Sequence, residues 1–288
     1  GGRWRGLYER ALPTYTMGDL GRAMEYLRAN HPHYIFRDQR SSVEFSAVPE
    51  GCVAEHYRPE DRLAEIAEGP ADSLEALTLE MAELLSKRAG IPMGTLGVTG
   101  SMLPGIHSPE LSDIDLVVYG RENSLRAKRA LLKLYEEPSS GVRKFHGKAL
   151  REWCEDKAKL YRLTVEEAEA LYARVWNRGL FRGRMFSIHP VKLPSEIRES
   201  YWDREYRPAG FIEIEAEVSD DSDSLFLPCR YAVSNVRVLE GPANVDVREV
   251  ASYEGLYSGI AERGDRIRAR GKLELVIDHA RGEEYHRV

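Results

Sequence analysis

The sequence predicts an α+β protein: a core with a short mixed sheet and flanking helices, a small N-terminal α/β extension, and a C-terminal, mainly-β, barrel-like domain. Helical and strand-like periodicities alternate between about residues 71 and 195. From Pro208 onward, apolar residues alternate with acidic ones at the period of two that is typical of strands. Because 288 residues allow two or three domains, we expect the extension over 1–70, the core over 71–195 and the β domain over 205–288.

In the extension, helical spacing runs from Leu20 to Leu27 and stops before Pro32, and strand-like stretches follow at 34–36 and 43–48. In the core, Asp72 is suited to N-cap a helix that Gly90 ends. The remaining stretches are predicted from their periodicity and from proline and glycine punctuation. Strands are predicted at 96–98, 113–119, 184–191, 212–218, 231–239 and 267–277, and helices at 124–136, 144–160 and 164–178.

Composition excludes several classes of protein. Hydrophobic residues make up 42% of the chain, and no run approaches the roughly eighteen apolar residues that span a bilayer. The net charge of -6 argues against a surface that coats nucleic acid as a whole, although a local basic cluster can still bind it. Cys52, Cys154 and Cys229 are too far apart for a disulfide framework or a zinc-ligand pattern. We therefore expect a cytoplasmic protein with reduced thiols.

Two aspartates in the predicted core strand are the strongest candidates for chemistry. Residues two apart on a strand project to the same face, so Asp113 and Asp115 present two carboxylates side by side while Ile114 turns into the core. Mg²⁺ prefers oxygen ligands and is typically held by one or two carboxylates together with substrate phosphates. The pair therefore predicts a site for Mg²⁺, or Mn²⁺, with a nucleoside triphosphate.

A Gly-Ser dipeptide supports this interpretation. Gly100 and Ser101 follow the preceding predicted strand, where a glycine lets backbone N–H groups approach phosphate oxygens and a serine hydroxyl adds a donor. An isolated Asp-x-Asp is a weak signal, and the chain contains a second one at 221–223 in a polar stretch. The conjunction of Gly-Ser with Asp113-Ile114-Asp115, across an eleven-residue connection, is specific.

With these residues the chain resembles the DNA polymerase beta nucleotidyltransferase superfamily, whose signature is Gly-Ser, a short spacer and Asp-x-Asp. The segments 96–101 and 113–120, with Phe226 to Tyr231, look like the uncharacterised archaeal predicted nucleotidyltransferases. The resemblance implies metal-dependent nucleotidyl transfer, with Asp113 and Asp115 as catalytic metal ligands and Gly100 and Ser101 as triphosphate binders. It does not identify the acceptor.

Active members of that superfamily usually carry a third carboxylate on the next core strand, where it binds metal and can accept a proton. The candidate strand 184–191 contains no acid, and His189 stands where one is expected. Glu213 and Glu215 are the substitutes if the sheet continues into the β region, but such alternating acids are also typical of a solvated strand face. The third acid is therefore left open.

Other residues are candidates for contact with phosphates, nucleotide or single-stranded nucleic acid. They are Arg178, Arg182 and Arg184, the basic run 263–272, and His107 in the loop before the aspartates. Ordinary solvated arginines and an exposed loop histidine explain them equally well.

The sequence thus predicts transfer of a nucleotidyl group from a nucleoside triphosphate to a hydroxyl on RNA, protein or a small molecule. The alternative is a nucleotide- or nucleic-acid-binding protein that keeps the fold with reduced catalysis. A free-standing toxin of this superfamily fits less well, because such proteins are commonly reduced to the core.

Overall fold

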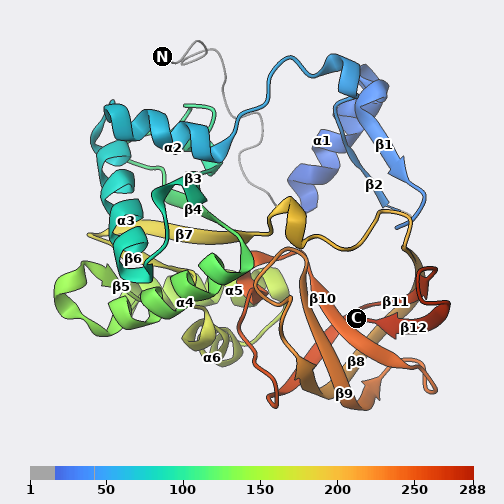
Figure 1. The fold of residues 1–288 in the computed structure, drawn as a ribbon. Coiled ribbons are helices and arrows are strands. Elements are labelled where there is room, and N and C mark those ends of the chain that lie inside the picture. The colour runs from blue at the N-terminus through green and yellow to red at the C-terminus, as the bar shows by residue number, and fades with distance from the viewer. Residues whose placement is uncertain (1–16, 42) are drawn as a thin grey trace.

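In the computed structural model, which describes residues 17–41 and 43–288, the chain forms a two-stranded sheet, a five-stranded sheet and a closed barrel (Figure 1). Mixed α/β segments precede the barrel, so the expected C-terminal sheet domain is confirmed. Residues 1–16 of the predicted extension lie outside the described chain.

The extension consists of α1 (Met17–Asn30) and the antiparallel hairpin of β1 (Ile35–Asp38) and β2 (Val43–Ser46). As predicted, the helix ends before Pro32. A hydrogen-bonded ion pair of 2.8 Å between Arg28 and Glu44 joins the helix to the hairpin.

Helix α2 (Pro59–Glu68) was not predicted, and it belongs to the core rather than to the extension. Leu63 and Ile66 are buried in the main apolar cluster. The helix packs so closely on the first core strand that a Cβ at Gly97 would lie 2.6 Å from the Pro59 backbone. Residues 59–68, which the sequence analysis included in the extension, therefore pack on the first strand of the core sheet.

The core sheet has the strand order β3-β4-β7-β6-β5. β4 and β7 are parallel, and the other neighbours are antiparallel. The strands are β3 (Leu96–Val98), β4 (Ile114–Tyr119), β7 (Arg184–Val191), β6 (Arg178–Phe181) and β5 (Val142–Arg143). β6 is a correction, because 164–178 was predicted to be helical to its end.

Helices cover the two faces of this sheet unequally. α3 (Ser73–Ala89) and α4 (Arg121–Glu136) pack on the face that carries Ile114, and their leucines share its apolar cluster. α5 (Gly147–Tyr161) and α6 (Val165–Arg174) contribute to a second cluster with Leu180, on the opposite face of β6. The opposite face of β4 is where the polar residues described below lie.

The barrel is closed in the order β10-β12-β11-β8-β9. Its members are β8 (Arg204–Asp220), β9 (Cys229–Glu240), β10 (Val247–Ser252), β11 (Arg266–Asp278) and β12 (Glu283–Arg287). Alternate β8 residues, Ile212, Ile214 and Ala216, are buried in the barrel's apolar cluster, as the predicted alternation requires.

Two barrel loops anchor the barrel to the core. Phe226, between β8 and β9, is buried in the main core cluster. In the loop between β10 and β11, the Ser258 carbonyl accepts a 3.0 Å hydrogen bond from the buried indole of Trp176, and the Gly259 carbonyl accepts one of 2.9 Å from Lys128. None of the helices within 17–41 and 43–288 is long and apolar enough to cross a membrane.

Candidate metal and nucleotide site

Asp113 and Asp115 lie at the start of β4, with Asp113 one residue before the strand. Ile114 between them is fully buried, and both aspartates are half-buried on the opposite face. As predicted, Ile114 lies on one side of the strand and the two aspartates lie on the other, because β4 packs its apolar side on α3 and α4.

Gly100 is held directly against Asp115. The Thr99 N–H donates to the Asp115 carbonyl at 2.9 Å, which extends the pairing of β3 and β4 by one residue. Gly100 then adopts a left-handed conformation with φ +64, and a Cβ there would collide with Oδ2 of Asp115. Only glycine therefore allows this turn to lie on the carboxylate.

Ser101 begins the loop that connects this turn to the aspartates. Its hydroxyl lies 3.2 Å from that of Ser112, which in turn accepts a 3.0 Å hydrogen bond from the Ser108 N–H. Arg184 on β7 donates at 2.6 Å to the Glu110 carbonyl and at 2.7 Å to that of Pro109. The loop is thus fixed from both sides, and Arg184 acts here as a structural donor.

A row of polar side chains crosses the sheet beside the aspartates. In the strand register, Asp115 of β4 is the partner of Ser187 of β7, and Ser187 is the partner of Arg178 of β6. The Ser187 hydroxyl donates to Oδ1 of Asp115 and lies 2.6 Å from Nε2 of His189. That imidazole nitrogen is 3.8 Å from Oδ1 of Asp115. The neighbours of Asp115 on the next strand are therefore a hydroxyl and an imidazole.

The two carboxyl groups have opposite electrostatic environments. Burial, together with the neighbouring charge of Asp115, raises the pKa of Asp113 above its ordinary value, and Arg184 and Arg178 only partly oppose this. Burial also acts to raise the pKa of Asp115, but the hydrogen bonds from His189 and Ser187 outweigh it and hold that pKa below the ordinary value.

The carboxylate oxygens of Asp113 and Asp115 suit a hard divalent cation that a bound substrate would also coordinate. Two carboxylates are the usual protein contribution to a Mg²⁺ site of this kind. Within the described chain, the aspartates form no close cluster with a third Asp, Glu, His or Cys ligand. Asp113 and Asp115 are therefore the residues that would hold a divalent cation here, and a substrate and water would supply its remaining ligands.

Glu213 and Glu215 were expected to supply the third carboxylate only if the core sheet continued into the β region. This expectation is wrong, because the core sheet does not continue into β8. Both residues lie in the barrel, where Glu213 is buried and Glu215 is half-buried. Glu213 is paired with Arg268, and Glu215 with Arg237 at 2.6 Å. That hydrogen bond from the guanidinium holds the pKa of the half-buried Glu215 below its ordinary value.

Two further sequence candidates do not reach the site. His107 is buried and its Nε2 lies 2.8 Å from the Asp72 carboxylate at the N-terminus of α3, so it is neither exposed nor free for nucleotide. Arg182 pairs with Glu80 at 2.5 Å. Asp223, from the second Asp-x-Asp, is bound at 2.9 Å by Lys192 and also by Arg121, and serves the contact between barrel and core.

Arg178 is, besides Arg184, a basic residue that the structure brings to the aspartates. Its charge acts on both carboxyl groups. In the described part of the chain, its buried Nε has no hydrogen-bond partner. The sequence pointed to this residue, whereas it missed Ser187. The signal for Ser187 was its position two residues before His189 on a predicted strand.

Comparison with known proteins finds a relative of this chain in an archaeon. The chain is 33% identical over 272 residues to an uncharacterised protein of Methanocaldococcus jannaschii, and the match covers 92% of this chain and 76% of that protein. No protein-family model matches the chain, and no solved structure does. The predicted resemblance to an uncharacterised archaeal protein is confirmed, and the nucleotidyltransferase assignment stays a prediction.

Proposed function

The chain belongs to the family of this uncharacterised Methanocaldococcus jannaschii protein, and we propose that it is a metal-dependent nucleotidyltransferase with a polymerase-beta-like core. The observation that carries the proposal is the contact between the Gly100 turn and the Asp115 carboxylate. It places a glycine turn with exposed backbone beside two adjacent acids, as binding of a metal-bound triphosphate requires.

Asp113 and Asp115 would hold Mg²⁺ or Mn²⁺, and the cation would stabilise negative charge on the transferring phosphorus group. Gly100 and Ser101 would bind the outer phosphates through the backbone N–H and the hydroxyl. Arg178, in the same row across the sheet, supplies a positive charge that is not neutralised by an ion pair within the described chain. Ser187 orients Asp115 by donating a hydrogen bond to Oδ1.

A second function is favoured by a specific observation: among the described residues, no third metal-ligating side chain clusters closely with Asp113 and Asp115. A protein with only two acids could bind a metal and a nucleotide yet transfer slowly or not at all. Ser187 and His189 occupy the positions beside Asp115 on β7, and an imidazole is a poor ligand for Mg²⁺. This candidate is a nucleotide-binding protein with reduced catalysis.

The test replaces Asp113 and Asp115 together by asparagine. The label of an α-³²P nucleoside triphosphate mixture is followed into RNA, protein and small-molecule fractions of an archaeal extract, with Mg²⁺ or Mn²⁺. We expect transfer by the wild-type protein and none by the double variant. Glu110→Gln is the matched control, because it removes an exposed carboxylate from the loop just before the aspartates.

Calorimetry of the same proteins with ATP, CTP, GTP and UTP, with and without Mg²⁺, separates the two candidates. Metal-dependent binding that requires the aspartates, without transfer into any fraction, assigns the binding function. Unchanged transfer by the double variant contradicts the enzyme, and metal-independent binding by the wild-type protein contradicts both candidates.

A further inference from the structure

The strand connections of the C-terminal barrel follow one particular pattern. β8, β9 and β10 form an antiparallel meander, β11 returns to pair with β8, and β12 pairs antiparallel with β11 and parallel with β10. Numbered within the barrel, the closed order is 1-2-3-5-4-1, with strands 3 and 5 parallel. This Greek-key order is that of the OB-fold, whose second and third strands provide a binding face for oligonucleotides or oligosaccharides.

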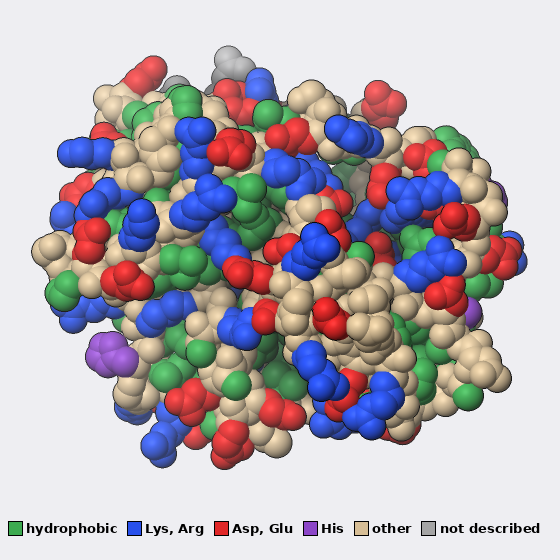
Figure 2. Space-filling view, turned by 60° about the horizontal axis from the view of Figure 1, so that its bottom comes forward, with side chains coloured by type: hydrophobic (Ala, Val, Ile, Leu, Met, Phe, Trp, Pro, Cys, Tyr) green, Lys and Arg blue, Asp and Glu red, His purple; other side chains and the backbone are tan. Residues whose placement is uncertain are grey.

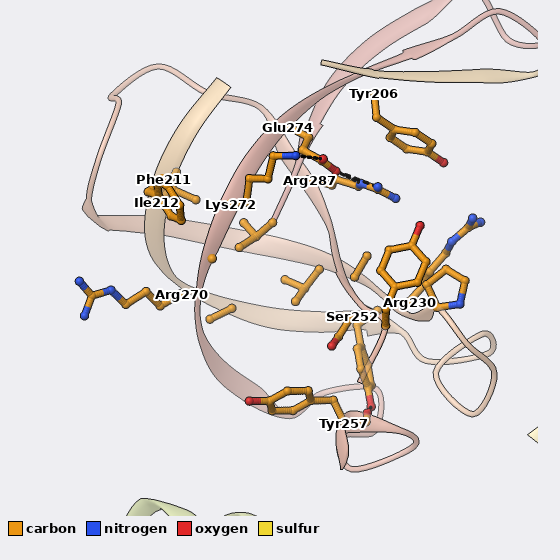
Figure 3. Close-up of a pocket in the computed structure, with 18 of the residues that line it drawn as sticks. Tyr206, Phe211, Ile212, Arg230, Ser252, Tyr257, Arg270, Lys272, Glu274 and Arg287 are labelled. Atoms are coloured by element: carbon orange, nitrogen blue, oxygen red, sulfur yellow. Dashed lines mark hydrogen bonds and ion pairs between the residues drawn. The ribbon is translucent and has the colours of Figure 1, made fainter. Parts of the chain in front are cut away.

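A large groove touches this face and continues over the first and fourth strands of the barrel. Its volume is about 1620 Å³, and its walls include Arg230 and Tyr231 from the second strand and Val250 to Ser252 from the third. Pockets for small ligands measure about 300–1,000 Å³, so the groove is large enough for part of a polymer. Figure 3 shows Phe211 and Arg270 at one side, and Tyr206, Arg230 and Arg287 at the other.

The loop between β8 and β9, which often contributes to binding in OB-folds, has another role here. It holds the barrel on the core through Phe226 and Asp223. The groove is bounded instead by the end of α5, with Tyr161 and Arg162, and by the β1–β2 hairpin, with Arg40 and Phe45. A ligand on the barrel would therefore also contact the core and the extension.

The groove carries unstacked aromatic rings next to cations. Phe211 is 77% exposed and Tyr253 is 70% exposed, although both line the groove. Arg162 lines it as well, is exposed, and has no ion pair in the described part of the chain. Arg270 and Lys272 add positive charge. Exposed rings that accept bases by stacking, beside cations that follow a phosphate backbone, are the features of single-strand binding sites.

The acids of the groove do not cancel this pattern, because its lining has eight arginine and lysine residues against six aspartate and glutamate residues. Glu213 is bound by Arg268, and Glu274 by Arg287 at 2.7 Å and Lys272 at 2.9 Å. On the face in Figure 2, basic and acidic side chains are interspersed over the surface. Attraction for a polyanion is therefore local, which agrees with the net charge of -6.

One end of the groove lies beside the row of residues that leads to the aspartates. Tyr161 donates a 2.9 Å hydrogen bond to Glu254, next to Tyr253. A Cβ at Gly255 would lie 3.7 Å from the guanidinium of Arg178. Arg178 in turn belongs to the row that contains Ser187 and Asp115. A strand lying in the groove could thus extend one end toward the two acids.

We propose that this groove binds single-stranded nucleic acid, with bases stacked on Phe211 and Tyr253 and phosphates beside Arg162, Arg270 and Lys272. The binding is independent of catalysis. That the bound strand presents its terminal hydroxyl as the acceptor is a further step, which rests on the proposed nucleotidyl transfer.

Binding is measured by fluorescence anisotropy of the full chain with labelled twelve-nucleotide RNA and DNA, at several KCl concentrations and without nucleotide or metal. We expect binding of at least one single strand and much weaker binding of the matching duplex. Tyr253→Ala should weaken binding about 5- to 150-fold, the effect of losing one stacked base. Tyr26→Ala, at 60% exposure on α1, is the control and should change nothing.

The phosphate contact is tested by Arg270→Ala against Arg237→Ala. Both side chains are 67% exposed and both lie near a glutamate of β8, but Arg237 does not line the groove. Only Arg270→Ala should reduce the slope of log affinity against log salt, by about 0.7 for one lost contact to a single strand.

Three results would overturn the proposal: no binding of either single strand at 50 mM KCl, no difference between the groove variants and their controls, or equal affinity for heparin with no effect of Tyr253→Ala. Binding that persists in the double aspartate variant supports the groove whether or not transfer is found. Transfer into RNA by a protein that does not bind the oligonucleotides contradicts the groove and leaves the enzyme intact.

Discussion

Replacing Gly100 by alanine separates the backbone requirement of this turn from its contact with Asp115. Gly100 has φ +64, a conformation that costs a residue with a Cβ about 1–2 kcal/mol. Gly90, which ends α3, has the same φ of 64 but has open space around a Cβ. Gly90→Ala is therefore a matched control, because it carries the backbone cost without a collision.

Both variants should lower the free energy of unfolding by about 1–2 kcal/mol, measured by urea titration of tryptophan fluorescence. Gly100→Ala alone must also move the carboxylate of Asp115, which Ser187 and His189 hold in place. We expect it to weaken Mg²⁺-dependent nucleotide binding at least about tenfold, or 1.4 kcal/mol, with little change for Gly90→Ala. Calorimetry with ATP and Mg²⁺ measures this difference.

Equal nucleotide affinity in the two variants would refute the reasoning, because the collision with Asp115 is the only feature that distinguishes them. A large loss of folded protein in Gly100→Ala but not in Gly90→Ala would show that the collision disturbs the strand pairing. In that case binding is compared in buffer without urea, per mole of folded protein in each variant.

Three other predictions concern groups that fix the core. Burial lowers the pKa of Lys144 to about 8, so the unfolded chain binds more protons than the folded chain between about pH 8 and 10.5, and the free energy of unfolding should rise with pH there. Lys144→Met should flatten that rise, which urea titrations at a series of pH values measure. An unchanged pH profile would contradict the prediction. Arg184→Ala should expose the loop before the aspartates to limited proteolysis, unlike Arg182→Ala; equal cleavage would show that the carbonyl contacts do not hold the loop. Asp72 is an N-cap that accepts 2.9 Å hydrogen bonds from two backbone N–H groups and also contacts His107. Asp72→Ala should therefore lower the free energy of unfolding by about 1–3 kcal/mol. A loss below about 0.5 kcal/mol would contradict this prediction.

Local signals predicted the long elements of the fold, and tertiary contacts decided the rest. The helix between Asp72 and Gly90 has both caps in its sequence, and the alternation from 212 to 218 indicates a half-buried strand. β5 has two residues, too few for any period to appear. β6, with Gly179 at its centre, is stabilised by pairing with β7, which no nearby residue encodes.

The same distinction holds for the candidate site. The placement of Asp113 and Asp115 follows from the period of a strand, and Gly100 from the short connection between adjacent strands. The identity of the neighbour across from Asp115 depends on the register of β4 and β7. The paired residues of these strands are 72 positions apart in the chain, as the pairing of 114 with 186 and of 115 with 187 shows. The sequence therefore shows correctly that β7 contains no acid, but it could not show that Ser187 is the residue in contact with Asp115.

The attachment of the barrel limits how a ligand could reach the aspartates. Phe226 is buried in the core, and Trp176 and Lys128 bind the loop between β10 and β11. These contacts lie on both loops nearest the core, so they oppose rotation of the barrel. The end of the groove at Tyr161 thus keeps its position beside Arg178. An acceptor strand held on the barrel would approach the metal site along one fixed direction, and its length, more than its base sequence, would decide whether its end reaches Asp113 and Asp115.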